Sequence, residues 1–158
     1  MKQRFGIAQA LLTNPKLIIV DEPTAGLDPA EKNRFYNLLS ALGEETVVVL
    51  STHIVDDVKE LCSNMAIINE GKVLLKGNPL EAMAGLEGKV YKKTIAKSEV
   101  ALYKQEYKVI SERLLLGKPM IHILSEQDPA NGFIPIEVDF DDVYFAQIFG
   151  GHTNTKTL

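Results

Sequence analysis

The sequence predicts an α/β protein, in which a strand–helix–strand unit is followed by a smaller part of α+β character. The first observation behind this prediction is a pair of short apolar runs, at residues 17–20 and 47–50, separated by a segment with helical spacing. The second is a change of pattern after residue 85, where the expected strands become more closely spaced. We therefore predict two domains, residues 1–85 and residues 86–158.

The strand–helix–strand unit is predicted from local signals. Continuous apolar runs such as 17–20 and 47–50 are typical of parallel strands buried on both faces. Between them, Asp28 and the proline after it predict the start of a helix, and Gly43 predicts its end. A right-handed connection is expected for such a unit. The remaining predicted elements before residue 86 are helices at 2–12, 54–62 and 79–85, and a hairpin at 65–75.

The second part is predicted to contain short strands and a closing helix. A turn at Gly117-Lys118 separates two of the strands, and Asp139 is expected to cap the helix. His122 lies in an apolar strand and His152 in a polar tail, so neither is expected to be a ligand or a catalytic residue. The strands are expected at residues 87–96, 107–115 and 120–124.

Composition narrows the possible functions. The chain has 158 residues, of which 46% are hydrophobic and 24% charged, in the range of globular proteins. Its formal net charge of −4 argues against a nucleic-acid partner, because binding to phosphates usually requires a basic excess. No apolar run approaches the roughly 20 residues of a membrane-spanning helix. The single cysteine, Cys62, has no partner for an internal disulfide and fits a reducing compartment.

Polar residues follow both predicted strands of the first part. Asp21 and Glu22 come directly after the first strand, and His53 follows the second. Ligands of open α/β sheets bind at the carboxyl ends of strands, so these side chains are candidates for a site. One carboxylate can hold a divalent cation such as Mg²⁺ while the other deprotonates a water molecule. Taken alone, the carboxylates also fit a solvated loop, His53 a turn and Asp28 a helix cap.

The order of these motifs resembles one family. The segment LIIVDEPTAGLDP at 17–29, followed by VVVLSTH at 47–53, resembles the ATPases of ATP-binding cassette (ABC) transporters. In that family the strand ending in Asp-Glu is the Walker B motif, residues 25–28 correspond to the D-loop, and His53 corresponds to the switch histidine. The helix at 2–12 and the hairpin at 65–75 also resemble their family counterparts. The resemblance covers residues 1 to about 85 and implies part of a P-loop NTPase domain.

The resemblance implies a role for each matching residue. Asp21 would help to bind Mg²⁺, Glu22 would be the general base, and His53 would contact the γ-phosphate of ATP. Asp28 would belong to a nucleotide-contacting loop that reaches across a dimer interface. The implied function is ATP hydrolysis that powers transport across the cytoplasmic membrane. The implied partners are a second nucleotide-binding domain and a transmembrane permease, which would place the chain at the cytoplasmic face of that membrane.

The sequence departs from the family in what it lacks. No G-x-x-x-x-G-K-[ST] phosphate loop occurs anywhere in the chain, and the family's Leu-Ser-Gly-Gly signature would end just before Met1. We therefore expect a truncated ATPase, inactive alone, whose two strands expose an apolar edge and face. An alternative is a non-catalytic interaction or regulatory module of a transporter complex. A cassette ATPase of DNA repair or translation is disfavoured by the absence of coiled-coil heptads and of a basic patch.

Overall fold

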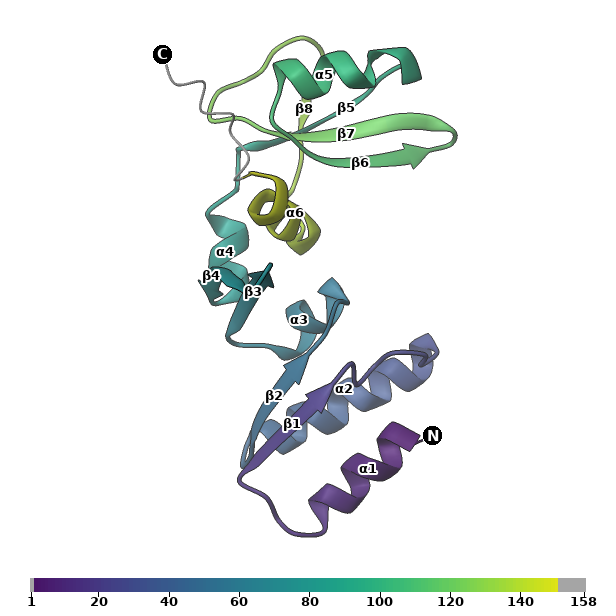
Figure 1. Cartoon of the computed structure of the whole chain (residues 1–158), viewed down its shortest axis with the longest axis vertical. Helices are drawn as coiled ribbons and strands as arrows, with labels where there is room; N and C mark the ends of the chain where they lie inside the picture. The colour runs from purple at the N-terminus through teal and green to yellow at the C-terminus, as the bar shows by residue number, and fades with distance from the viewer. Residues whose placement is uncertain (1, 151–158) are drawn as a thin grey trace. The chain divides into compact units, whose positions relative to one another are not determined.

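The computed structural model describes residues 2–150 and has the mixed α/β character that the sequence predicts (Figure 1). It divides into two compact units, Met1–Cys62 and Ser63–Leu158. The hairpin and helix predicted for residues 65–85 belong to the second unit. The domain boundary predicted between residues 85 and 86 stays a prediction. His152 and the polar tail lie outside the described residues.

The first unit contains the predicted strand–helix–strand arrangement. Its two strands are parallel and in register, with Leu17 opposite Val47 and Asp21 opposite Ser51. Asp28 caps the intervening helix, because its Oδ1 accepts a hydrogen bond of 2.8 Å from the backbone N–H of Glu31. The elements of this unit are α1 (Lys2–Leu11), β1 (Leu17–Asp21), α2 (Pro29–Gly43), β2 (Val47–Ser51) and α3 (Val55–Leu61).

The two faces of this small sheet differ. Phe35 and Leu39 of α2 are buried, and Val20 and Val48 pack against them. Strand side chains alternate between faces, so the neighbouring residues point the other way. Burial of both faces was expected from the apolar runs and is wrong, because the described helices cover only one face. The exposed apolar face that was expected for a truncated ATPase is confirmed. It is formed by residues that are 48–73% exposed, namely Leu17, Ile19, Val47 and Val49.

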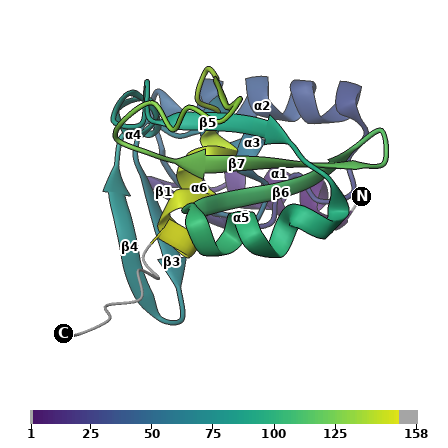
Figure 2. The same cartoon turned by 90° about the horizontal axis from the view of Figure 1, so that it is seen from above.

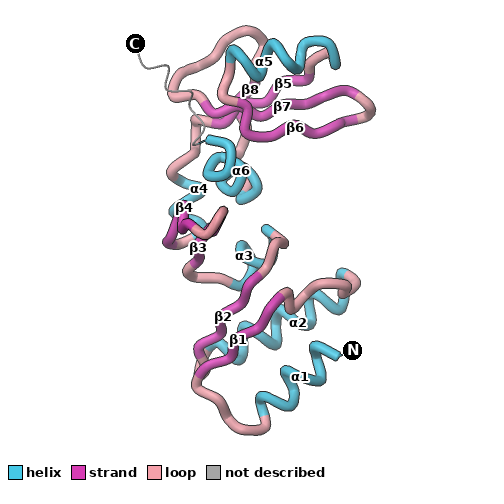
Figure 3. Tube along the Cα trace, in the orientation of Figure 1, coloured by secondary structure: helices cyan, strands magenta, loops and turns pink. Residues whose placement is uncertain are grey.

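The second unit is a hairpin followed by a sheet with a helix on each face. The sheet has the strand order β6-β7-β5-β8, and every pairing in it is antiparallel. Helices α5 and α6 lie on opposite faces of it (Figures 2 and 3). The elements are β3 (Met65–Asn69), β4 (Lys72–Gly77), α4 (Pro79–Ala84), β5 (Val90–Thr94), η1 (Lys97–Glu99), α5 (Val100–Glu106), β6 (Val109–Leu115), β7 (Lys118–Leu124), β8 (Ile134–Pro135) and α6 (Phe140–Gly150).

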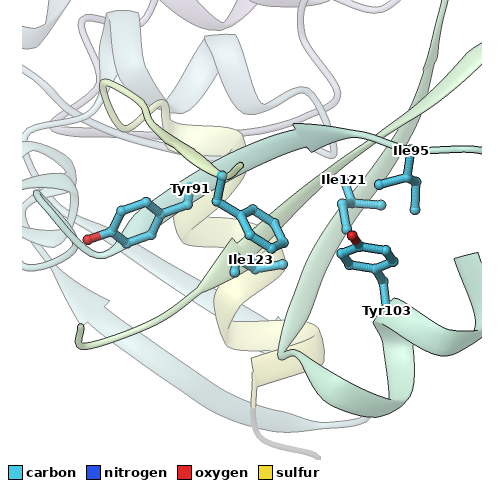
Figure 4. Close-up of a cluster of buried hydrophobic side chains, with 6 residues drawn as sticks. Tyr91, Ile95, Tyr103, Ile121 and Ile123 are labelled. Carbon is cyan, nitrogen blue, oxygen red and sulfur yellow. The ribbon is translucent and has the colours of Figure 1, made fainter. Parts of the chain in front are cut away.

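Helix α5 was not predicted, although it completes a core. Its Tyr103 packs against Ile121 and Ile123 of β7 (Figure 4). The signal was present, since Val100 and Tyr103 are three residues apart, at the spacing of one helix face. The helix is short, and its stability therefore comes from this packing rather than from helix propensity.

The opposite face of the sheet holds a buried polar pair. His122 Nδ1 of β7 lies 2.7 Å from Asp142 Oδ1 of α6, and both side chains are buried. Burial alone would raise the pKa of Asp142, but the hydrogen bonds from His122 and from the Asp139 N–H lower it overall. The pair therefore links β7 to α6 inside the second unit. None of the helices described for residues 2–150 combines the length and apolar character that crossing a bilayer requires.

Candidate functional site

The carboxyl ends of β1 and β2 bring the predicted site residues together. Asp21 and Ser51 are register partners, and the backbone N–H of Glu22 donates to the Ser51 carbonyl at 2.8 Å. The two chains therefore leave the sheet at the same edge. Asp21, Glu22 and His53 converge there, as the predicted parallel pairing of the two strands implies.

Glu22 and His53 form a close pair. The backbone N–H of His53 donates to Glu22 Oε1 at 2.9 Å, and His53 Nδ1 lies 2.7 Å from the same oxygen. Glu22 has a φ of 47°, a left-handed conformation that side-chain-bearing residues seldom adopt. Such strain is typical of functional sites, where the surrounding structure maintains it. Here the turn directs the Glu22 carboxylate toward the loop after β2.

Asp21 has a different environment. Its Oδ1 accepts a hydrogen bond from the hydroxyl of Ser51, and its side chain is exposed. Among residues 2–150 there is no group of three or more His, Cys, Asp or Glu side chains that could hold a metal ion. A single carboxylate is nevertheless a suitable protein contribution for Mg²⁺, which keeps several water ligands and takes others from substrate phosphates. Asp21 thus fits a magnesium site of that kind.

Asp28 uses its carboxylate differently. The side chain caps α2 through the Glu31 N–H, which is the structural role that the sequence allowed for it. Its predicted part in contacting nucleotide across a dimer interface stays a prediction.

Asp57 of α3 was not predicted from the sequence as a site residue. This carboxylate is fully buried and has four partners around its two oxygens. Thr24 Oγ1 donates to it at 2.5 Å, Tyr36 OH at 2.6 Å and Thr52 Oγ1 at 3.0 Å, and Lys32 Nζ completes the group at 2.9 Å. Buried charges are tolerated when they are paired and hydrogen-bonded in this way.

Asp57 joins the two loops that carry the site. Thr24 follows Glu22 by two residues, and Thr52 immediately precedes His53. One carboxylate therefore holds both loops against α3. The only local signal for this role is spacing, since Asp57 lies four residues before Leu61 on the inward side of the helix.

The network shifts two pKa values. Burial would raise the pKa of Asp57, but the hydrogen bonds from Thr24, Tyr36 and Lys32 lower it overall. Burial, together with the bond to Asp57, raises the pKa of Tyr36 to about 12. A lowered carboxyl pKa stabilises the fold above the unfolded value of 3.8 and loses its effect as the pH falls further. A raised tyrosine pKa stabilises the fold below pH 10 and loses its effect as the pH rises toward 12.

Tyr36→Phe tests the alkaline part of this account. The variant loses a hydrogen bond to a charged group, so a destabilisation of about 1.5–3 kcal/mol is expected near neutral pH. The difference from the parent chain should shrink between pH 10 and 12, because the tyrosine ionises there in the unfolded chain while Tyr36 of the folded chain, with a pKa of about 12, stays mostly protonated. Amide exchange in α2 and β2 measures this stability difference within the first unit. A difference that stays constant through pH 12 would contradict the assigned pKa. Exposed Tyr144, changed to Phe, serves as the control.

Comparison with known proteins identifies relatives among transporter ATPases. The energy-coupling factor transporter ATP-binding protein EcfA2 of Clostridium perfringens is 41% identical over 88 residues, which are 54% of this chain and 31% of that protein. ABC transporter A family member 7 of Arabidopsis thaliana is 29% identical over 157 residues, which are 99% of this chain and 16% of that protein. The second match therefore extends through the α+β part. No protein-family model matches the chain.

One solved structure is also among the similar proteins. CbiO1 from Clostridium perfringens, part of the ABC transporter complex cbiONQ, is 41% identical, with a TM-score of 0.46 over 49% of this chain and 32% of that chain. The chain thus spans about a third or less of the length of each of these relatives.

Proposed function

Because this chain is homologous to the ATP-binding proteins of ABC transporters, we propose that it supplies the hydrolytic part of their nucleotide site. The observation that carries the proposal is the Glu22–His53 pair beside Asp21 at the carboxyl ends of β1 and β2. A carboxylate base, a cation ligand and a histidine at one strand edge are groups suited to attack of water on a phosphate.

Each residue has a distinct part in this proposal. Asp21 would hold Mg²⁺, which when bound neutralises the charge that develops on the transferred phosphoryl group. Glu22 would accept a proton from the attacking water at its carboxylate. The hydrogen bonds from the backbone N–H and Nδ1–H of His53 to Glu22 Oε1 would fix both side chains. The doubly protonated ring of His53 would also donate from Nε2 to a phosphate oxygen. The strained backbone at Glu22 would place the base in advance, so that less reorganisation is needed at reaction.

The proposal also includes the protein parts that would complete the nucleotide site. The phosphate loop is absent from this sequence, so the residues that hold the β- and γ-phosphates must lie elsewhere in the functional protein. A second nucleotide-binding domain would complete the site, and a permease at the cytoplasmic membrane would use the hydrolysis for transport. The competing proposal is a non-catalytic module of the transporter. It is less favoured because such a module does not need the Glu22–His53 pair.

The first test concerns nucleotide binding. The purified chain is expected to show no measurable affinity for Mg-ATP, because it has no cradle of backbone amides and no lysine for the phosphates. Isothermal titration calorimetry with millimolar ATP measures this directly. Binding with a micromolar dissociation constant would show that the chain holds nucleotide by other residues. The proposed division between phosphate binding and hydrolysis would then be wrong.

A further inference from the structure

The β6–β7 hairpin of the second unit ends in three consecutive exposed leucines. Leu114, Leu115 and Leu116 are 68%, 52% and 98% exposed. The hairpin tip extends beyond α6 in both views of the ribbon (Figures 1 and 2). These side chains are not part of the unit's buried core. A convex tip of this kind exposes far more apolar surface than scattered single leucines do.

The turn itself does not explain a leucine at its apex. Leu116 and Gly117 have φ values of 49° and 80°, the positive pair of a two-residue type I′ turn. Asn, Asp and Gly are preferred at the first of these positions because they tolerate the left-handed conformation. Leu116 is strained there, and at 98% exposure its side chain gains little burial from the described residues of the unit. Contact with another molecule would offset this strain.

Two lysines lie beside the turn that carries the leucines. Lys118 is the register partner of Leu115, and Lys97 lines a shallow cavity of about 470 Å³ together with Lys118. The carboxylates nearby have other partners. Glu99 accepts from the Ala96 N–H at 2.8 Å, and Glu112 pairs with Lys104 at 2.7 Å.

We propose that this hairpin tip inserts into the interface of a membrane that contains anionic lipid. The leucines would lie at the boundary of the acyl chains, and Lys97 and Lys118 among the phosphate groups. A lipid surface fits better than a protein groove because the tip is convex and carries no aromatic or hydrogen-bonding anchor of the kind that dominates protein interfaces. The inference does not depend on the proposed hydrolytic site, since it uses only residues of the second unit.

The absence of tryptophan from the sequence allows a local test. Leu116→Trp in the full chain places a unique fluorophore at the tip. Its emission is expected to shift to shorter wavelength with vesicles of phosphatidylcholine and phosphatidylglycerol, and brominated acyl chains should quench it. Leu102→Trp, at a half-exposed position on α5, is the matched control and should show neither effect. Because the signal is local, vesicle binding through the apolar face of the first unit cannot produce it.

Binding measurements complete the test. In the variant L114T/L115T/L116N, threonine keeps strand propensity and asparagine suits the left-handed turn, so folding should be retained. Its vesicle partition coefficient is expected to fall at least about a hundredfold, since each buried leucine contributes about tenfold. Replacing Leu80 and Leu102 with Gln should change little. Replacing Lys97 and Lys118 with Gln should lower binding to anionic vesicles by about fivefold per lysine.

Two results would overturn the proposal. One is an unshifted emission of the Leu116→Trp variant with anionic vesicles, which would assign the tip to a protein partner. The other is vesicle binding that the triple variant leaves intact, which would assign membrane affinity to another surface. If the triple variant does not fold, L116N alone and the fluorescence of the Leu116→Trp variant still decide between these results.

Discussion

Asp57→Ala is expected to destabilise the first unit by about 3–5 kcal/mol, the usual range for breaking a buried ion pair. The substitution removes the acceptor shared by Thr24, Tyr36 and Thr52 and the counter-charge of Lys32. One of these donors, Thr24, is buried and would be left without its partner, which adds to the loss. Because Asp57 ties both site loops to α3, the loops around Glu22 and His53 should also become mobile.

Asp56→Ala is the matched control, since Asp56 is the exposed neighbour of Asp57 in the same helical turn. It is expected to change stability by less than about 0.5 kcal/mol. Urea unfolding followed by amide exchange in α2 and β2 measures both variants. Asp57→Asn should lie between them, because an amide oxygen retains part of the network. If Asp57→Ala is no more destabilising than the control, the network contributes little to the fold.

The elements that the sequence predicted are those with local signals. Helix α2 begins after Asp28 and ends at Gly43, where a capping side chain and a glycine were expected to place its ends. The β3–β4 turn lies at Glu70 and Gly71, both with positive φ, as the turn signal predicted. Such signals act over three or four residues, so they are visible without knowledge of the tertiary structure.

The missed elements depend on distant contacts. In α5 the helical spacing is marked only by Val100 and Tyr103, and β8 is only two residues long, so neither pattern stands out. The face on which each strand is buried also depends on what covers it. For that reason the apolar runs of β1 and β2 predicted burial on both faces, whereas Ile19 and Val49 are exposed.

The difference between local sequence signals and distant contacts also applies at the candidate site. Asp21, Glu22 and His53 could be predicted together because parallel strands must bring their carboxyl ends to one edge. The Asp57 network could not, because Thr24, Tyr36 and Thr52 are brought to it by tertiary structure and share no sequence motif that reasoning from spacing identifies. The strain at Glu22 is likewise visible only in the backbone of the folded chain.

In a polypeptide that also contains a phosphate loop, Glu22→Gln is expected to abolish hydrolysis without abolishing nucleotide binding. The amide keeps the size of the side chain and an oxygen that can accept from the His53 N–H, so the local structure should survive. It cannot take a proton from water, and the loss should be at least about a hundredfold, the low end of general-base contributions. Removing one negative charge near the phosphates should leave ATP binding equal or tighter.

The measurement that tests the central claim is the ATP turnover of a polypeptide in which residues 1–158 are preceded by a segment of a homologous ATP-binding protein that carries both the phosphate loop and the Leu-Ser-Gly-Gly signature. Glu70→Gln, in the exposed β3–β4 turn, provides the matched control. We expect turnover in the parent and in the control, with Glu22→Gln slower by at least about a hundredfold at unchanged or tighter ATP affinity. Turnover by Glu22→Gln at nearly the parent rate would contradict the account, because the Glu22–His53 pair could then not be the hydrolytic centre.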